Sequence, residues 1–283
     1  AEDHGTLEVF DLATGAHLQT VKGPIETPHS ILYMPDVHKL LVTDTGKHMS
    51  QYFDSRTYAP LGPLKLVQGA DSVGYDAPRR RLYIVTGGKD VPMADSWLEE
   101  VDPRTGREYS KIHFDANHVE AMAVEQHGPR LFINVTDKNY IAVIDKAKHA
   151  VVAHWPVTAA EQNCCFALDE ANHRLFVVTR KPGKLLVLDS NSGATLASFD
   201  APLRVDQLLW DERHHRAYAL GGQGYTNIVE ERGPNQFVEL PPLVTAPGAK
   251  TGIIVPERNE MFVVASPGES KALASILRVD LGQ

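Results

Sequence analysis

The sequence predicts an all-β protein, a β-propeller whose blades have four antiparallel strands each, over residues 1–283 as a single domain. Three observations support this fold class. One apolar segment recurs at a regular interval, an acidic residue ends the strand that follows each copy, and no long segment has the period of a helix. We expect one blade to be incomplete, because the chain starts at a third strand.

The recurring segment is seen most clearly in RLYIVTGG, RLFINVTD and RLFVVTRK. Its second position recurs every 42 to 49 residues, at Leu40, Leu82, Leu131, Leu175, Ala217 and Met261. A unit of four short strands that repeats every ~40–50 residues is typical of a propeller blade. A β-sandwich with irregular strands is the alternative, but sandwich strands do not repeat in phase.

A second series of strands ends in Asp, namely EVFD, QYFD, EEVD, AVID, LVLD and LRVD, and all of these but EVFD follow a copy of the segment. Several of these continue into a turn such as DLATG, DPRTG or DSNSG, in which Gly supplies a positive φ without a steric penalty. We count six first strands, six second strands and seven third strands. The two missing inner strands would lie upstream of residue 1, and the last blade takes its outer strand from HLQTV or lacks one.

The repeats resemble the YVTN-type repeat of bacterial propellers, on the strength of RLYIVTGG, RLFVVT and the VID/VLD–TG turns. HVEAMAVEQHGPRLFINVTDKN, ALDEANHRLFVVTRKP and TAPGAKTGIIVPERNEMFVV resemble the YncE-like subgroup, and the resemblance covers nearly the whole chain. It implies seven blades and a periplasmic or secreted protein. No signal peptide opens the chain, so we expect an export segment to have been removed or not supplied.

Composition and motifs exclude several classes of function. The net charge of −8 argues against nucleic-acid binding, and no apolar run approaches the roughly 18 residues of a membrane span. The chain has no G-x-S-x-G elbow, no P-loop, no HExxH motif and no paired-cysteine zinc spacing.

A polar ring is predicted at the mouth of the central channel, which the first strand of each blade should line. The aligned first positions of these strands are His29, Asp71, Glu120, Cys164, Asp206 and Thr251. His118 and Asn163 lie close enough in sequence to join the ring. Cys165, next to Cys164, should alternate to another side of the strand and pack as a small hydrophobe.

The ring is also a candidate metal site, formed by His29, Asp71, Glu120, Cys164 and Asp206. Carboxylates around a narrow channel repel one another unless a cation intervenes. Carboxylates alone suit Ca²⁺, whereas His29 and Cys164 favour Zn²⁺ or copper. A metal-free, water-filled channel remains the alternative.

Basic residues in the loops between second and third strands should form a rim around this ring. They are Lys47, His48, Lys89, Lys138, Arg180, Lys181 and Lys271. Lys250 precedes Thr251 and should reach the mouth itself. Such a rim would steer an anionic ligand inward, unless these side chains are only solvated loop lysines. The basic clusters APRRR and ERHHR fall in the turns at the opposite face and are expected to be surface.

Two functions follow from this arrangement. The first is an exported binding or scaffold propeller that takes a small anionic molecule or a protein partner at the channel mouth. The second is a metal-dependent enzyme, a lyase or lactonase-like hydrolase, in which His29 or Glu120 acts as general base and a metal or Lys250 stabilises an anion. The second interpretation rests on analogy of fold.

Overall fold

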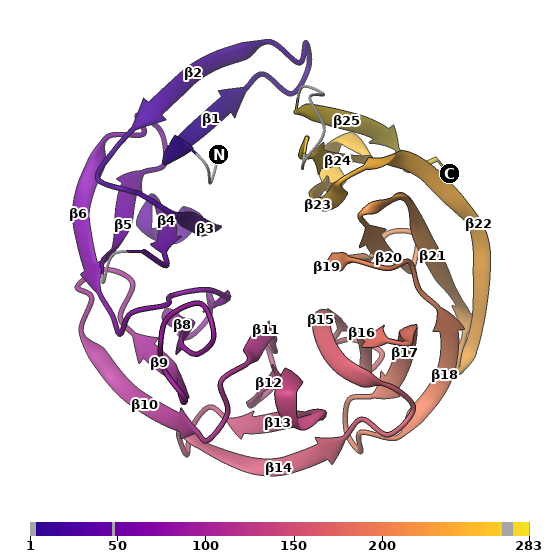
Figure 1. The fold of residues 1–283 in the computed structure, drawn as a ribbon. Helices are drawn as coiled ribbons and strands as arrows, with labels where there is room; N and C mark the ends of the chain where they lie inside the picture. Colours follow the sequence, from indigo (N-terminus) through magenta and orange to yellow (C-terminus); the bar gives the residue numbers. More distant parts are fainter. Residues whose placement is uncertain (1–3, 47–48, 268–273, 283) are drawn as a thin grey trace. The chain divides into compact units, whose positions relative to one another are not determined.

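The computed structural model describes residues 4–46, 49–267 and 274–282, which form antiparallel sheets joined by turns and three short 3₁₀ helices (Figure 1). Consecutive strands pair in chain order within every sheet. The two-stranded sheet contains β1 (Thr6–Phe10) and β2 (His17–Lys22). The three-stranded sheet contains β23 (Ala249–Val255), β24 (Glu260–Ala265) and β25 (Ser275–Asp280).

Five sheets have four strands. The first contains β3 (Pro28–Met34), β4 (Lys39–Asp44), β5 (Met49–Asp54) and β6 (Pro60–Lys65), and the second contains β7 (Val73–Asp76), β8 (Arg81–Gly87), β9 (Ser96–Val101) and β10 (Glu108–Phe114). The third contains β11 (Val119–Val124), β12 (Arg130–Val135), β13 (Tyr140–Asp145) and β14 (Ala150–Pro156), and the fourth contains β15 (Glu161–Asp169), β16 (Arg174–Lys181), β17 (Gly183–Asp189) and β18 (Thr195–Asp200). The fifth contains β19 (Val205–Asp211), β20 (Arg216–Gly221), β21 (Gln223–Gly233) and β22 (Gln236–Pro247). The 3₁₀ helices are η2 (Pro35–Val37), η3 (Thr136–Lys138) and η4 (Pro256–Arg258).

The fold is an all-β propeller with four-stranded antiparallel blades, as predicted, but the described residues form six blades rather than seven. Within the described residues, the expected incomplete unit is the two-stranded sheet of β1 and β2. HLQTV lies in β2 and pairs with β1, and the sheet of β23 has three strands in the described part of the chain.

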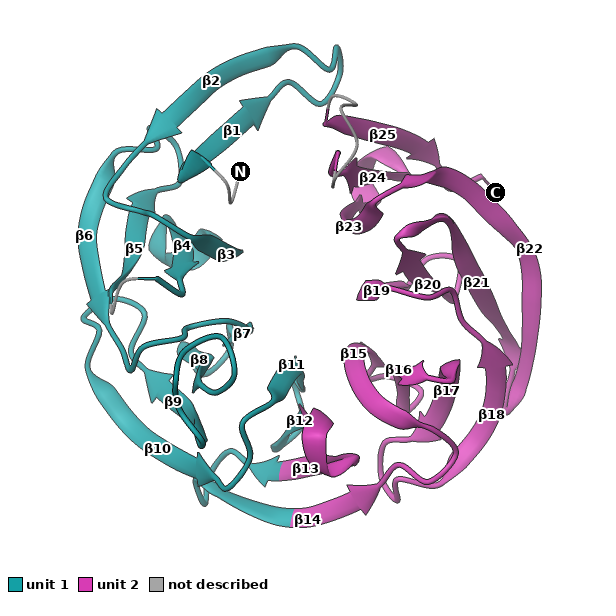
Figure 2. Cartoon of the chain, viewed as in Figure 1, with its two compact units in different colours: residues 1–133, 144–152 teal, residues 134–143, 153–283 magenta. Residues whose placement is uncertain are grey.

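The chain divides into two compact units (Figure 2). Unit 1 contains residues 1–133 and 144–152, and unit 2 contains residues 134–143 and 153–283. The expectation that residues 1–283 form a single domain therefore stays a prediction.

The second strand of a sheet is buried along almost its whole length, which explains the apolar runs of the repeat. In β8, Leu82 to Thr86 are all buried, and in β16 the buried run is Arg174 to Thr179. Outer strands such as β14 instead alternate between partly buried and exposed residues, as expected when one face is solvated.

The hydrophobic core lies between neighbouring sheets within each unit. In unit 1, Met34 and Leu41 of one sheet pack in a cluster with Leu82 and Ile84 of the next. In unit 2, the corresponding cluster joins residues of β16 and β17 to residues of β19 and β20, among them Phe176, Val178, Val187, Leu208 and Ala219. Sheets packed face to face in this way leave little room on their faces for polar groups.

In five of the sheets, an Asp at the end of a strand closes the turn to the outer strand. The carboxylate of Asp189 accepts hydrogen bonds from the backbone N–H groups of Asn191 (2.7 Å) and Ser192 (3.0 Å). Gly193 then takes a φ of 75° and donates its N–H to the carbonyl of Asp189. Asp11, Asp54, Asp102 and Asp145 make the same pair of bonds to the backbone. The repeated Asp is therefore structural.

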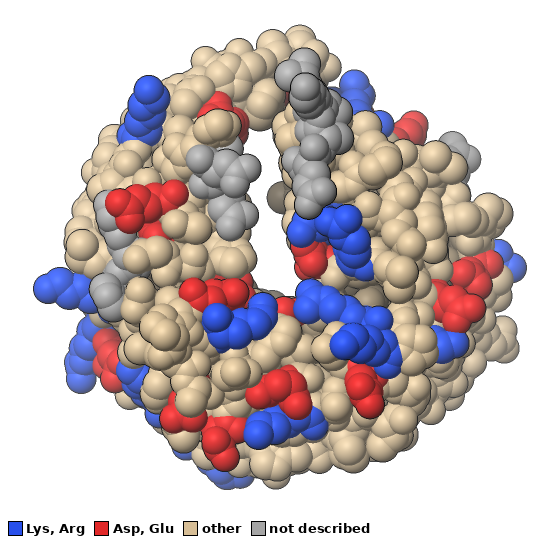
Figure 3. Space-filling model, viewed as in Figure 1, with Lys and Arg blue, Asp and Glu red and all other residues tan. Residues whose placement is uncertain are grey.

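Charged side chains gather at the strand ends and turns, because the sheet faces are filled by apolar residues. On the face drawn in Figure 3, Lys and Arg side chains lie close to Asp and Glu side chains in several places. Paired charges of this kind produce no large patch of one sign on that face.

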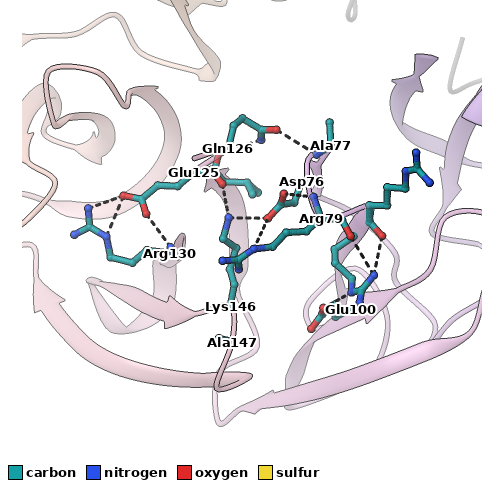
Figure 4. Close-up of polar contacts among 12 residues, drawn as sticks. Asp76, Ala77, Arg79, Glu100, Glu125, Gln126, Arg130, Lys146 and Ala147 are labelled. Carbon is teal, nitrogen blue, oxygen red and sulfur yellow. Dashed lines mark hydrogen bonds and ion pairs between the residues drawn. The ribbon is translucent and has the colours of Figure 1, made fainter. Parts of the chain in front are cut away.

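One ion pair is fully buried, and it joins two neighbouring sheets of unit 1 (Figure 4). The ammonium of Lys146, in the turn after β13, donates to Oδ2 of Asp76 at 2.6 Å and to the backbone carbonyl of Glu125. The two side chains are 1% and 0% exposed. Removal of one partner would leave an unpaired charge in the interior, which is strongly unfavourable.

We predict that Lys146→Met lowers the free energy of unfolding by about 3–5 kcal/mol, because the buried carboxylate of Asp76 loses its counter-ion. Urea denaturation measures the change. Lys148→Met is the matched control, since Lys148 is 70% exposed and its pairing with Asp145 should contribute less than about 1 kcal/mol. The double variant Asp76→Asn/Lys146→Met should recover much of the loss. Equal effects of the two lysine substitutions would show that the buried pair has no special role.

Candidate functional site

Several first strands contain an irregularity near their start, at the positions where the polar ring was predicted. The pairing shifts by one residue between Asn163 and Cys165 in β15, between Val205 and Gln207 in β19, and between Ala249 and Thr251 in β23. β3 has a similar shift between Pro28 and Ile31. An extra residue of this kind interrupts the alternation of side chains and redirects the strand.

The three shifts in unit 2 leave one residue of each strand without a partner in the register: Cys164, Asp206 and Lys250. Lys250 is therefore the structural equivalent of Asp206, whereas the sequence alignment placed Thr251 there. The alignment differs by one residue because a bulge is defined by the pairing between two strands. The sequence spacing of the repeats carries no information about that pairing.

The two cysteines both lie in the core of unit 2. Cys164 and Cys165 are each 2% exposed, and both belong to the apolar cluster that contains Phe176 and Leu208. Their sulfur atoms are 3.0 Å apart, and each lies 3.7 Å from the carbonyl oxygen of Val205. The expectation that they point to different sides of the strand is wrong, because the bulge places both side chains in the same core.

A charged cluster at the start of β19 and β23 brings together three predicted site residues of unit 2. Lys250 forms an ion pair with Oδ2 of Asp206, and Nη2 of Arg180 lies 3.5 Å from Oδ1 of the same carboxylate. The three side chains are about one-third exposed, at 36%, 31% and 29% for Lys250, Asp206 and Arg180. Two cations therefore share one carboxylate at a solvent-accessible position.

A second cluster, in unit 1, surrounds Glu120. Oε1 of Glu120 contacts Nε2 of His118 and lies 3.6 Å from Nζ of Lys89. Gly88 positions this lysine: it has a φ of 80°, and a Cβ there would come within 2.7 Å of the carbonyl oxygen of Asn117. The backbone N–H of Lys89 donates to the same carbonyl at 2.7 Å. Lys89, the residue after RLYIVTGG, thus extends from the predicted basic rim to Glu120 of the predicted polar ring.

Asp71 and His29 form a looser contact in the same unit, with Nε2 of His29 3.8 Å from Oδ1 of Asp71. Burial raises the pKa of the Asp71 carboxyl group. The positive charge of His29 opposes this rise, and the negative charge of Glu120 adds to it.

The space between these unit 1 residues is small. A cavity of about 10 Å³ is lined by residues that include Asp71, Gly88, Lys89, Asn117 and His118. That volume holds roughly one water molecule. This cavity is therefore too small for an organic ligand.

Asn163 has a structural position in unit 2. It is fully buried, and its amide donates to Oδ1 of Asn134 at 2.5 Å and to the carbonyl of Tyr140 at 3.1 Å. These bonds connect β15 to β12 and β13 rather than presenting the amide to solvent.

The predicted ring is thus found as two clusters, one in each unit. His29, Asp71, His118, Glu120 and Lys89 belong to unit 1, and Arg180, Asp206 and Lys250 belong to unit 2. Among the described residues, no three or more His, Cys, Asp or Glu side chains are placed to hold one metal ion. Lys47, His48 and Lys271 of the predicted rim lie outside the described residues.

Sequence reasoning missed the pairing between rim and ring. It placed Lys89 in a rim around the ring and Lys250 at the channel mouth, without naming a partner for either, whereas Lys89 lies 3.6 Å from Glu120 and Lys250 forms an ion pair with Asp206. The only signal for this was the proximity of Lys250 to an expected first strand, which gave no direction for its side chain.

Comparison with known proteins gives a fold and a distant relative. The chain is 26% identical over 204 residues to the uncharacterized protein YncE of Salmonella typhi, and equally so to YncE of Salmonella typhimurium. The match covers 71% of this chain but 52% of each relative, so the chain spans about half the length of the curated relatives it matches. No family model matches the sequence.

Solved structures with the same fold have little sequence in common with this chain. A functionally unknown protein from Desulfotomaculum acetoxidans superposes with a TM-score of 0.78 at 10% identity, covering 94% of this chain and 87% of that one. A chain of the mitotic checkpoint complex has a TM-score of 0.78 at 12% identity (92% and 78% covered), and hydrazine synthase from Kuenenia stuttgartiensis has 0.71 at 14% (89% and 76% covered). These structures support the propeller fold of this chain.

The raised pKa of Asp71 predicts a pH-dependent effect of Asp71→Asn. A carboxyl group with a raised folded-state pKa stabilises the fold below its unfolded pKa of about 3.9, and this stability is lost as the pH rises through the folded value. Asp71→Asn should therefore increase the free energy of unfolding at pH 7, with a gain that shrinks toward zero near pH 3. Urea denaturation at both pH values tests this. Asp90→Asn, at an exposed neighbouring carboxylate, is the control. A gain that is the same at both pH values would contradict the assignment.

Proposed function

We propose that this chain is a binding protein that takes an acidic group of a small molecule or of a protein partner at the Arg180–Asp206–Lys250 cluster of unit 2. The observation that carries the proposal is the sharing of one partly exposed carboxylate by two cations. All three side chains are about one-third exposed, so a ligand can reach the two cations.

The internal ion pairs of this cluster are of the kind that a ligand can replace. Pairs between solvent-exposed groups contribute only about 0–1 kcal/mol, so the carboxylate of Asp206 competes weakly with an incoming one. Arginine can present two parallel N–H donors to a carboxylate, and lysine adds a point charge beside it. An acidic ligand would thus be recognised by the same two side chains that hold Asp206.

The fold agrees with a binding or scaffold role, since propellers serve many functions through the loops at their strand ends. One structurally similar chain is a component of a multiprotein assembly, the mitotic checkpoint complex. No helix among the described residues is long and apolar enough to cross a membrane. For the metal-dependent enzyme, the described residues provide no specific observation in its favour.

We predict that a fluorescent hexaglutamate peptide binds the protein and that Lys250→Gln or Arg180→Gln weakens this binding about twofold to fivefold, as expected for exposed charge contacts of roughly 0.5–1 kcal/mol. Asp206→Asn should act in the opposite direction and tighten binding, because it removes the competing carboxylate. Fluorescence anisotropy at two salt concentrations measures these changes, and unlabelled succinate as competitor tests whether a small dicarboxylate is sufficient.

The matched control is Arg258→Gln. Arg258 is 33% exposed and paired with Glu260, and it lies in η4, at the opposite end of β23 from Lys250. Its substitution should leave peptide binding unchanged. If the control weakens binding as much as Lys250→Gln, or if Asp206→Asn also weakens it, the cluster is not the binding site.

We also propose that the protein is exported, on the basis of the resemblance of its repeat to exported bacterial propellers. In the native host, the product of the full-length gene with a carboxy-terminal epitope tag should be released by osmotic shock together with a periplasmic marker enzyme. Retention with a cytoplasmic marker would exclude export.

A further inference from the structure

A larger cavity lies in unit 1, at the end of the strands opposite to Lys89. Its volume is about 330 Å³, within the range of small-molecule sites. The lining residues are Arg79, Arg81, Tyr83, Glu100, Lys146, Ala147 and His149. They come from the turn between β7 and β8, from β8 and β9, and from the turn between β13 and β14. The basic cluster APRRR, expected to be only surface, thus contributes to a cavity.

The acidic groups at this cavity are already neutralised by partners. Glu100 accepts a hydrogen bond from Ser110 (2.8 Å), contacts Nδ1 of His149 (2.6 Å) and is paired with Nε of Arg81 (3.1 Å). Asp76, below the cavity, is paired with the buried ammonium of Lys146 (Figure 4). Three cations, Arg79, Arg81 and Lys146, lie beside these two carboxylates, so the group has one excess positive charge.

Arg79 carries that remaining charge. Its side chain is 41% exposed, and its Nε is 3.9 Å from the carboxylate of Asp76, too far for a hydrogen bond. Arg81, in contrast, is fixed by Glu100, by the carbonyl oxygens of Arg79 and Arg80, and by stacking 3.8 Å from the Tyr109 ring. A guanidinium held at the edge of a cavity with most of its donors unused is suited to bind an oxyanion bidentately.

A second donor in the same cavity lacks a partner. Tyr83 is 2% exposed, and its buried hydroxyl group has no hydrogen-bond partner within the part of the chain that the structure describes. Buried hydroxyl groups are nearly always hydrogen-bonded, and an unpaired one is unfavourable by roughly 1–3 kcal/mol. An acceptor atom supplied by a bound molecule would satisfy it.

We propose that this cavity binds a small molecule through a phosphate or carboxylate group, with Arg79 as the principal donor and Tyr83 and Lys146 at the cavity wall. Glu100, Arg81 and His149 fix the shape of the wall through their mutual contacts. The site is independent of the Arg180–Asp206–Lys250 cluster, since it belongs to unit 1 and uses different residues.

Isothermal titration with inorganic phosphate, and separately with acetate, at constant ionic strength tests this site. One of the two anions should bind wild-type protein saturably at one site, and which one binds identifies the phosphate or the carboxylate as the recognised group. Arg79→Gln should weaken that binding by about tenfold or more, the effect of losing a hydrogen bond to a charged group.

Arg80→Gln is the matched control, because Arg80 is the adjacent residue, is 64% exposed and pairs with Asp36 without lining the cavity. It should leave the affinity within about twofold of wild type, which is small beside the tenfold loss expected at Arg79. Tyr83→Phe should weaken binding while leaving the unliganded protein at least as stable, since it removes only a hydroxyl group without a partner. Absence of saturable binding of either anion, or equal losses in the Arg79 and Arg80 variants, would overturn the proposal.

Discussion

Burial of the inner strands on both faces is the constraint on which the rest of this structure depends. In β8 and β16 nearly every side chain is in the interior, and an unpaired charge there would be strongly unfavourable. Exposed charged groups therefore gather at the ends of the strands, and β8 shows both ends, with Arg81 at one and Lys89 just beyond the other. A buried acid such as Glu99 is accommodated only with its partners in place: it accepts from the hydroxyl of Thr86 at 2.7 Å and the N–H of Val67 at 2.9 Å.

The two ends of the strands use charge differently. At the starts of β19 and β23, the charged pairs are partly exposed, so each contributes little to stability. At the opposite strand ends in unit 1, the pair of Lys146 and Asp76 is fully buried and joins two sheets. Loss of one partner of such a buried pair would greatly lower the stability of the fold, so the pair holds the two sheets together. The guanidinium of Arg79 lies 3.9 Å from Asp76 of this pair and lines the cavity beside it.

Much of the fold could be predicted from the sequence, because the repeat of RLYIVTGG-like segments and the Asp-ended strands record local rules of strand and turn formation. The closing role of Asp189 and its equivalents was visible in the DSNSG type of turn. The strand counts were visible too, since the six first, six second and seven third strands all form; a total of seven blades, which rested on the family resemblance, was not correct for the described residues, which form six. Nor was the contact between Lys146 and Asp76 predictable, because the partners are distant in the chain and meet only through the packing of sheets.

The bulges explain why the candidate site was predicted only in part. Cys164, Asp206 and Lys250 occupy the same structural position in three successive first strands of unit 2. Each is left out of the pairing register, so the side chain at that position can change without altering the hydrogen bonds that hold the strand in register. In β15 the position is filled by a thiol that packs into the core, and in β19 and β23 by opposite charges that attract each other. The same backbone position thus recurs in each of these strands, whereas the side chain at that position differs from blade to blade. The periodicity of the sequence identifies the position, but it does not show which way the side chain points or which group it contacts.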